Sequence, residues 1–392
     1  TPQLSNVDAL YLQHTTADAN DSAATKETID LTSSTGLGAL YLDIVDADTD
    51  DNSVYDITNF GGSAIHLSQT SGESPDVMNI DGTGQASLTL KTYDFNASAG
   101  TDIVVTQVDS LTVDTYETVT VSGTTSEVTN TVLGAITADD ADAVTVKNDG
   151  QSATLGSVVF TTGAISADAA QNLTFTAGSN GELVTGAITS TSNAVDTITL
   201  TASDDGILDI TSIDASGSDL SSLTVTAGIG ARIDEGTNAT TVLPITADSI
   251  TAATVTVGAA STAALSLLYA GTTTIALTTG STLDIGDIGV AALVSNTTVT
   301  GRGTLQGTLD LLGTATLTFS GFTSTGGALT IDGDSDGNKT ITGNDGANIM
   351  STGGGDDSVT GGAAIDTIST AAGDDIINGG ADADEIDAGT GA

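Results

Sequence analysis

GNDGANIMS (343–351), TGGGDDSVT (352–360), GGAAIDTIS (361–369), TAAGDDIIN (370–378) and GGADADEID (379–387) are consecutive nine-residue segments that repeat one pattern. Position six holds an acid or its amide in every segment, namely Asn348, Asp357, Asp366, Asp375 and Asp384. Position eight holds Met350, Val359, Ile368, Ile377 and Ile386. The nine residues before them, DSDGNKTIT (334–342), keep the register through Ile341 but carry Lys339 at position six, so we interpret them as a cap.

The nine-residue spacing predicts a turn of about six residues followed by a very short strand. Two such segments complete one circuit, so residues 18 apart should stack at the strand spacing of about 4.8 Å. This places Asp357 against Asp375, Asp366 against Asp384, and Asn348 against Asp366. Stacked carboxylates repel each other unless a cation lies between them. The position-eight aliphatic residues should fill the core.

Calcium is the cation that this pattern predicts. Ca²⁺ takes six to eight oxygen ligands, which carboxylates and inward-facing turn carbonyls can supply. Glycine allows the positive φ that such turns need. Besides the position-six residues, the candidate ligands are the acids at position five, Asp356 and Asp374, and the turn residues Gly353, Gly355, Gly362, Gly373 and Gly380. Ala364 and Asp382 replace the position-four glycine, so some sites are expected to be weak or empty. The alternative, a flexible Gly/Asp-rich tail, explains the composition but not the shared register.

The repeat resembles the G-G-x-G-x-D-x-U-x nonapeptide of RTX proteins. That resemblance covers residues 334–391 and implies a parallel β-roll wound around several calcium ions. It also implies type I secretion through an uncleaved C-terminal signal, which we expect to lie outside this chain.

Three further acidic loops are candidate cation sites. Asp332, Asp334 and Asp336, followed by Gly337, match the start of a D-x-D-x-D-G calcium loop, although Gly343 stands where an EF-hand has glutamate. Asp46, Asp48 and Asp50 share the spacing, and Asp139, Asp140 and Asp142 form a third cluster. The alternative for each of them is a solvated acidic loop.

The rest of the chain is a looser repeat of short strands. Segments such as Val144–Val146, Ile198–Leu200 and Leu223–Val225 alternate aliphatic residues with threonine, and D/N-G turns separate them. Their recurrence at intervals of mostly 19 to 33 residues favours a β-solenoid. The 3% aromatic content suggests a narrow interior without room for rings. Immunoglobulin-like sandwiches are the alternative, but they would require longer strands and an aromatic core.

These patterns predict an all-β chain in which a parallel β-solenoid runs into a C-terminal RTX calcium β-roll. We expect a β-rich N-terminal segment over residues 1–110, an irregular solenoid over 111–331, and the roll over 332–392. Helices should be nearly absent, because no stretch keeps a 3.6-residue apolar period.

The charge of the 392-residue chain restricts its partners. With 51 acidic and six basic residues, the formal net charge is −45. This excludes nucleic acid as a partner and opposes docking on bare anionic lipid. Disorder is the alternative for such a charge, but 38% of the residues are hydrophobic and lie in short β-branched runs. No apolar run is long enough to span a membrane. Cysteine is absent, and a calcium roll favours an extracellular location, where calcium is plentiful.

An enzyme is not expected. His14 and His66 are the only histidines, and Arg232 and Arg302 the only arginines, so a catalytic triad or a basic sugar-binding groove is poorly supplied.

An acidic, cysteine-free, Thr-, Ala- and Gly-rich β-solenoid with RTX units is similar to the calcium-dependent surface-layer proteins of Gram-negative bacteria. The resemblance implies a structural protein that assembles with copies of itself into a sheet or tube at the cell surface. Lipopolysaccharide or the outer membrane would be a partner through an anchor that the sequence does not reveal. An RTX adhesin stalk, or the non-catalytic calcium module of a secreted enzyme, remain the alternatives.

Overall fold

The computed structural model contains β-strands and no helix in the part of the chain that it describes. It describes residues 7–16, 26–32, 36–46, 54–71, 77–82, 87–92, 103–114, 116–123, 129–149, 158–191, 194–235, 242–264, 270–287, 297–310, 315–324, 329–332, 337–343 and 346–391. Within these ranges no helix is long and apolar enough to cross a membrane.

The strands fall into two compact units, residues 1–195 with 206–211, and residues 196–205 with 212–392. The first unit contains β1 (Ala9–Thr16), β2 (Lys26–Asp30), β3 (Ala39–Asp46), β4 (Val54–Phe60), β5 (Ala64–Ser71), β6 (Val77–Gly82), β7 (Ser87–Thr92), β8 (Ile103–Asp114), β9 (Thr118–Gly123), β10 (Thr129–Thr137), β11 (Ala143–Asn148), β12 (Val158–Thr162), β13 (Ile165–Ser166), β14 (Asn172–Ala177) and β15 (Gly181–Thr189). The strand β17 (Ile207–Ala227) begins in this unit and continues in the second.

The second unit contains β16 (Thr197–Ala202), β18 (Arg232–Asp234), β19 (Ile245–Val257), β20 (Thr262–Ala264), β21 (Ala270–Asp287), β22 (Thr297–Asp310), β23 (Ala315–Ser324), β24 (Leu329–Asp332), β25 (Lys339–Thr342), β26 (Asn348–Ser351), β27 (Ser358–Gly362), β28 (Thr367–Ser369), β29 (Ile376–Gly380) and β30 (Glu385–Asp387). The three segments expected from the sequence stay a prediction.

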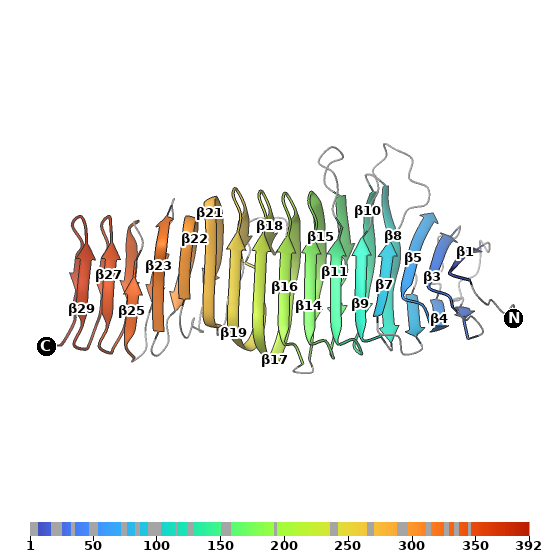
Figure 1. Ribbon diagram of the computed structural model, residues 1–392, viewed down its shortest axis with the longest axis horizontal. Helices are drawn as coiled ribbons and strands as arrows, with labels where there is room; N and C mark the ends of the chain where they lie inside the picture. The colour runs from blue at the N-terminus through green and yellow to red at the C-terminus, as the bar shows by residue number, and fades with distance from the viewer. Residues whose placement is uncertain are drawn as a thin grey trace. The chain divides into compact units, whose positions relative to one another are not determined.

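In the first unit the strands pair in parallel as two files, and the chain visits the files in turn. One file runs β1, β3, β5, β7, β9, β11 and β14. The other runs β2, β4, β6, β8 and β10, then β12 with β13, and β15. Figure 1 shows β7, β9, β11 and β14 side by side with their arrows aligned. The all-β class and the parallel pairing are therefore confirmed.

Alternation along each strand forms the core. In β11, Val144 and Val146 are fully buried, whereas Thr145 between them is partly exposed. The register stacks like on like, since Thr145 pairs with Thr120 of β9 and Thr174 of β14. Each added strand thus extends an inner aliphatic row and an outer threonine row, as the sequence predicts.

Rows of the same kind run through the second unit into the nonapeptide segments. The outer row comprises Thr199, Thr224, Thr254, Thr274, Thr298, Thr318, Thr342 and Thr360. One residue earlier in each strand, the inner row passes from Leu317 to Ile341, Val359 and Ile377. The nonapeptide core therefore continues the core of the strands before it.

The nonapeptide segments form two files with the predicted 18-residue offset. Thr340 pairs with Ser358, and Ser358 with Ile376, in the file of β25, β27 and β29. Thr367 pairs with Glu385 between β28 and β30 of the other file. We call each strand, with the turn before it, a rung of its file. Figure 1 shows β25, β27 and β29 in sequence.

The expectation that the interior has no room for rings is wrong. Tyr55, Phe60, Tyr116, Phe160 and Phe175 are all at most 1% exposed. Glycines make the space for two of these rings, Phe160 and Tyr116. A Cβ on Gly123 would lie 2.4 Å from Cγ of Phe160, and one on Gly82 would lie 2.7 Å from the ring of Tyr116. The Tyr116 hydroxyl also donates a hydrogen bond to the Phe60 carbonyl at 3.2 Å.

Candidate metal centre

The turns of the nonapeptide segments share one backbone feature, because positions two and four adopt positive φ. Position two is represented by Gly353, Gly362, Ala371, Gly380 and Gly389, and position four by Gly337, Gly355, Ala364, Gly373 and Asp382. At position four the glycines have φ between 122° and 153°, whereas Ala364 and Asp382 have φ of 67° and 73°. Replacement of the consensus glycine therefore keeps φ positive but shifts it into the left-handed helical region.

Glycine is required most where two successive turns stack backbone on backbone. A Cβ on Gly373 would lie 2.0 Å from the Gly355 carbonyl oxygen, and one on Gly380 would lie 2.0 Å from the Gly362 carbonyl oxygen. No side chain can occupy such a position without moving a neighbouring turn. The turn carbonyls of successive rungs are consequently held close together.

The position-six side chains form a ladder inside each file. Their Oδ1 atoms accept hydrogen bonds from the backbone N–H of the residue 18 positions earlier: Asp357 from Lys339 at 2.7 Å, Asp366 from Asn348 at 2.8 Å, Asp375 from Asp357 at 2.9 Å, and Asp384 from Asp366 at 3.0 Å. The stacking of residues 18 apart is therefore confirmed. Each carboxylate ties one turn to the turn before it.

The second oxygen of two of these carboxylates has no hydrogen-bond partner among the described residues. Asp366 is fully buried, and its Oδ2 has no hydrogen-bond partner in the described structure; the buried Oδ2 of Asp375 also lacks one. Oδ2 of Asp357, in contrast, accepts a hydrogen bond from the Thr352 hydroxyl. A buried carboxylate oxygen without a partner carries a large desolvation cost.

Repulsion between the stacked carboxylates is a second reason why a cation would stabilise these turns. Two carboxylates about 5 Å apart repel by about 3 kcal/mol at the effective dielectric of a partly buried site. Burial raises the pKa of Asp357, and the charge of Asp375 raises it further, against the lowering effect of the Thr352 and Lys339 hydrogen bonds and of the Lys339 charge. A divalent cation would reverse this balance by favouring the ionised form.

The first rung of each file carries a donor at position six instead of a carboxylate. Nζ of Lys339 donates to the Gly337 carbonyl at 2.7 Å, and Lys339 is only 1% exposed. In the other file, Nδ2 of Asn348 donates to Oδ1 of Asp366 and to the carbonyl of Gly346.

Position five forms a second ladder, on the exposed side of the turns. The N–H of Asp356 donates to Oδ1 of Asn338 at 3.1 Å, and the N–H of Asp374 donates to Oδ1 of Asp356 at 2.9 Å. Both acids are exposed. A metal-ligand role for Asp356 and Asp374 stays a prediction. In the structure they connect successive turns, which the repeat alone does not indicate.

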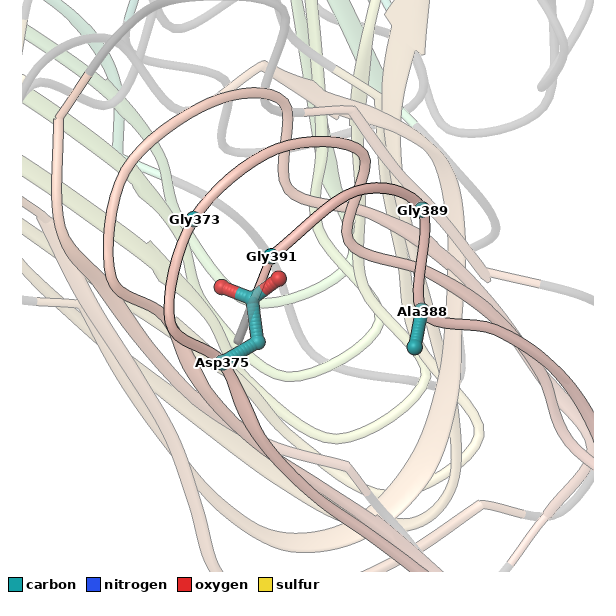
Figure 2. A pocket seen from close by; sticks show the side chains of 5 residues that line it. All are labelled: Gly373, Asp375, Ala388, Gly389 and Gly391. Atoms are coloured by element: carbon teal, nitrogen blue, oxygen red, sulfur yellow. The ribbon is translucent and has the colours of Figure 1, made fainter.

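A pocket of about 210 Å³ lies against the carboxylate of Asp375. Gly373, Ala388, Gly389 and Gly391 line the rest of it. Figure 2 shows the Asp375 carboxylate pointing into the loop drawn by these residues. The position-six side chain thus faces the inside of the turns, among backbone atoms.

The ligand chemistry is that of a hard cation. Within the described residues, no three His, Cys, Asp or Glu side chains converge to hold a metal ion. A cation in these turns would therefore have to take backbone carbonyls alongside one or two carboxylates. Such all-oxygen sites, with Asp366 or Asp375 supplying the unpartnered carboxylate oxygen, suit Ca²⁺.

The other predicted acidic sites are described only in part. Asp48, Asp50, Asp334 and Asp336 lie outside the described residues, and Asp46 and Asp332 are the last residues of β3 and β24. The structure therefore does not test either loop as a cation site.

The third acidic cluster lies in a described turn before β11. Oδ1 of Asp139 accepts hydrogen bonds from the Ser166 hydroxyl at 2.6 Å and from the Asp168 N–H at 3.2 Å. The side chains of Asp140 and Asp142 are exposed, and the Asp142 carbonyl accepts the Gln171 N–H at 2.7 Å. The cluster connects adjacent rungs, and its role as a cation site stays a prediction.

No protein-family model, curated protein or solved structure matches the chain.

Proposed function

We propose that this protein is a calcium-dependent structural protein of a bacterial cell surface. In this proposal the parallel files wind as a β-solenoid that runs into an RTX-type calcium β-roll, and copies of the chain assemble into a surface layer outside the cell. The observation that carries the calcium requirement is the buried, unpartnered Oδ2 of Asp366. That oxygen lies in a stack of carboxylates that needs a cation.

The extracellular location in this proposal follows from the calcium requirement. A calcium-loaded roll is stable where free calcium is in the millimolar range of extracellular modules, as outside a bacterial cell. Binding of the ion to the folded roll alone would stabilise it by mass action. The chain would therefore leave the cell unfolded and fold when it meets calcium.

The charge supports assembly through cations. At a formal net charge of −45, two copies repel each other until divalent ions neutralise or bridge their surfaces. The partner that we propose is thus a second copy of the chain. Attachment to lipopolysaccharide or to the outer membrane would need an anchor for which the described residues offer no candidate.

Electron microscopy of the purified protein, in EDTA and after addition of millimolar calcium, tests the proposal. Ordered sheets or tubes that appear only with calcium are expected. Separate particles in calcium would refute the surface-layer function and favour an adhesin stalk. Turnover of a polysaccharide or lipid substrate would instead favour the calcium module of a secreted enzyme. An unchanged protein in both conditions would refute the calcium requirement itself.

A further inference from the structure

The first rungs of the roll differ from the later ones in a chemically consistent way. Lys339 stands 18 residues before Asp357, and Asn348 stands 18 residues before Asp366, at position six of the two files. Both residues bring hydrogen-bond donors to a place where the next rungs bring only acceptors. The sequence predicts a cap in the segment that contains Lys339, and the structure shows the contacts of its side chain.

Asn348 defines the environment most completely. Its Nδ2 lies 2.7 Å from the Gly346 carbonyl oxygen, 2.8 Å from Oδ1 of Asp366 and 3.4 Å from the Gly361 carbonyl oxygen. Two turn carbonyls and a carboxylate are the oxygen types that a calcium ion takes. The amide group of Asn348 therefore occupies a cation-like position between two turns.

Lys339 occupies the corresponding position of the other file with a full positive charge. Its Nζ donates to the Gly337 carbonyl, which, like that of Gly346, belongs to position four. The side chain is buried, and its charge acts on the carboxylate of Asp357 in the next rung. Lysine is among the least buried residue types, and it is buried only where its charge is balanced.

The following rungs have no such donor. At position six Asp357 is followed by Asp375, and Asp366 by Asp384, so carboxylate faces carboxylate in both files. The buried Oδ2 atoms of Asp366 and Asp375 lack partners in these rungs.

We propose that the Lys339 ammonium and the Asn348 amide replace bound cations in the first rung of each file, so that these rungs form without calcium and only the carboxylate pairs beyond them take the ion. The proposal rests on the calcium roll of the proposed function and specifies which of its sites bind. The first rungs would then act as a preformed template on which the calcium-dependent rungs fold.

Calcium stoichiometry of the full chain, measured by equilibrium dialysis, tests the assignment. Lys339→Asp and Asn348→Asp each convert a donor into a carboxylate, and each is expected to bind one more calcium ion than the unaltered protein. Lys147→Asp is the matched control, because it makes the same charge change at a half-exposed residue whose partner is Asp149. It should leave the number unchanged. An unchanged number in both roll variants would overturn the proposal.

Hydrogen exchange of β25 and β27 separates this proposal from the calcium roll itself. In EDTA the unaltered protein should protect the amides of β25, and both Lys339→Asp and Lys339→Met should lose that protection. Calcium should restore it in Lys339→Asp, which can hold an ion, but not in Lys339→Met, which cannot. Equal exchange of β25 in all three proteins in EDTA would overturn the role of Lys339, whether or not calcium binds elsewhere.

The two proposals can thus fail separately. If the unaltered protein binds no calcium, the proposed function fails, while protection of β25 that depends on Lys339 would still identify its ammonium as a structural cation. If calcium binds but Lys339→Met folds like the unaltered protein, the calcium roll stands and the built-in cation is refuted.

Discussion

The rungs around β9, β11 and β14 and the rungs around β25, β27 and β29 share one architecture but are stabilised by different means. The former pair six-residue strands and bury three side chains in each. The latter pair strands of four or five residues, and Asp357 is buried at the turn before β27. Shorter strands bury less apolar surface, so their stability depends on buried polar ladders and on what neutralises them.

Removal of calcium should separate the two regions most strongly. In EDTA, we expect the amides of β29 and β30 to exchange at nearly the rate of an unfolded chain, because the carboxylate pairs repel without an ion. Those of β11 and β14 should stay protected. Hydrogen exchange with mass spectrometry measures both, and magnesium replaces calcium as the control. Equal protection of β29 with and without calcium would contradict the comparison.

A cavity in the aliphatic region should cost stability whether or not calcium is present. Phe160→Ala removes a fully buried ring and should lower the free energy of unfolding by about 3–5 kcal/mol. The matched overpacking variant is Gly123→Ala, whose Cβ would meet the Phe160 ring at 2.4 Å and which should cost about 1–3 kcal/mol. Denaturant titration in EDTA and in calcium gives both values. A loss of stability that appears only in calcium would contradict the assignment of Phe160 to the region that is stable without the ion.

The stability cost of replacing a turn glycine by alanine should increase with the closeness of the neighbouring turn. Gly373→Ala places a Cβ 2.0 Å from a backbone oxygen and should prevent the rungs of β29 from stacking. Gly353→Ala should cost only about 1–2 kcal/mol, because Ala371 already adopts φ 59° at the equivalent position. Measurements of calcium affinity and of thermal unfolding distinguish the Gly373→Ala and Gly353→Ala variants. Equal effects would show that the backbone conformation, rather than the close approach, determines the cost.

The smallest expected effect is at alkaline pH. Burial, with the charge of Asp81 in addition, raises the pKa of Tyr116 above that of an ordinary tyrosine. A raised folded-state pKa means that its stabilisation is present below the unfolded pKa of about 10 and is lost as the pH rises above it. Tyr116→Phe should therefore flatten the decline of stability above pH 10. If stability declines equally above pH 10 in the unaltered protein and in Tyr116→Phe, the decline comes from other groups.

Much of this fold was predictable because its signals are local and repeated. The V-T-V alternation fixes which side chains face inward, and the nine-residue spacing fixes which residues stack, as the pairing of Thr340 with Ser358 confirms. The buried rings were not predictable from composition. The space for Tyr116 and Phe160 comes from Gly82 and Gly123, and sequence spacing does not reveal which glycine faces which ring.

The candidate site was predictable in its residues but not in its bonds. The position-six acids could be named from the repeat, whereas the ladder from the Asp357 N–H to Asp375 Oδ1 requires coordinates. Lys339 looked like an interruption of the motif. Its donor chemistry was the available signal, since an ammonium among acids spaced by nine residues has a charge of the same sign as the expected ion.

The 18-residue offset between stacked rungs has a consequence for how such a gene can change. Insertion or deletion of 18 residues adds or removes one rung from each file and leaves every remaining pair, such as Ser358 with Ile376, in register. A nine-residue change would instead move each later segment to the opposite file. The array can therefore lengthen by duplication in double units without disturbing its register, and the number of ion sites would change with its length.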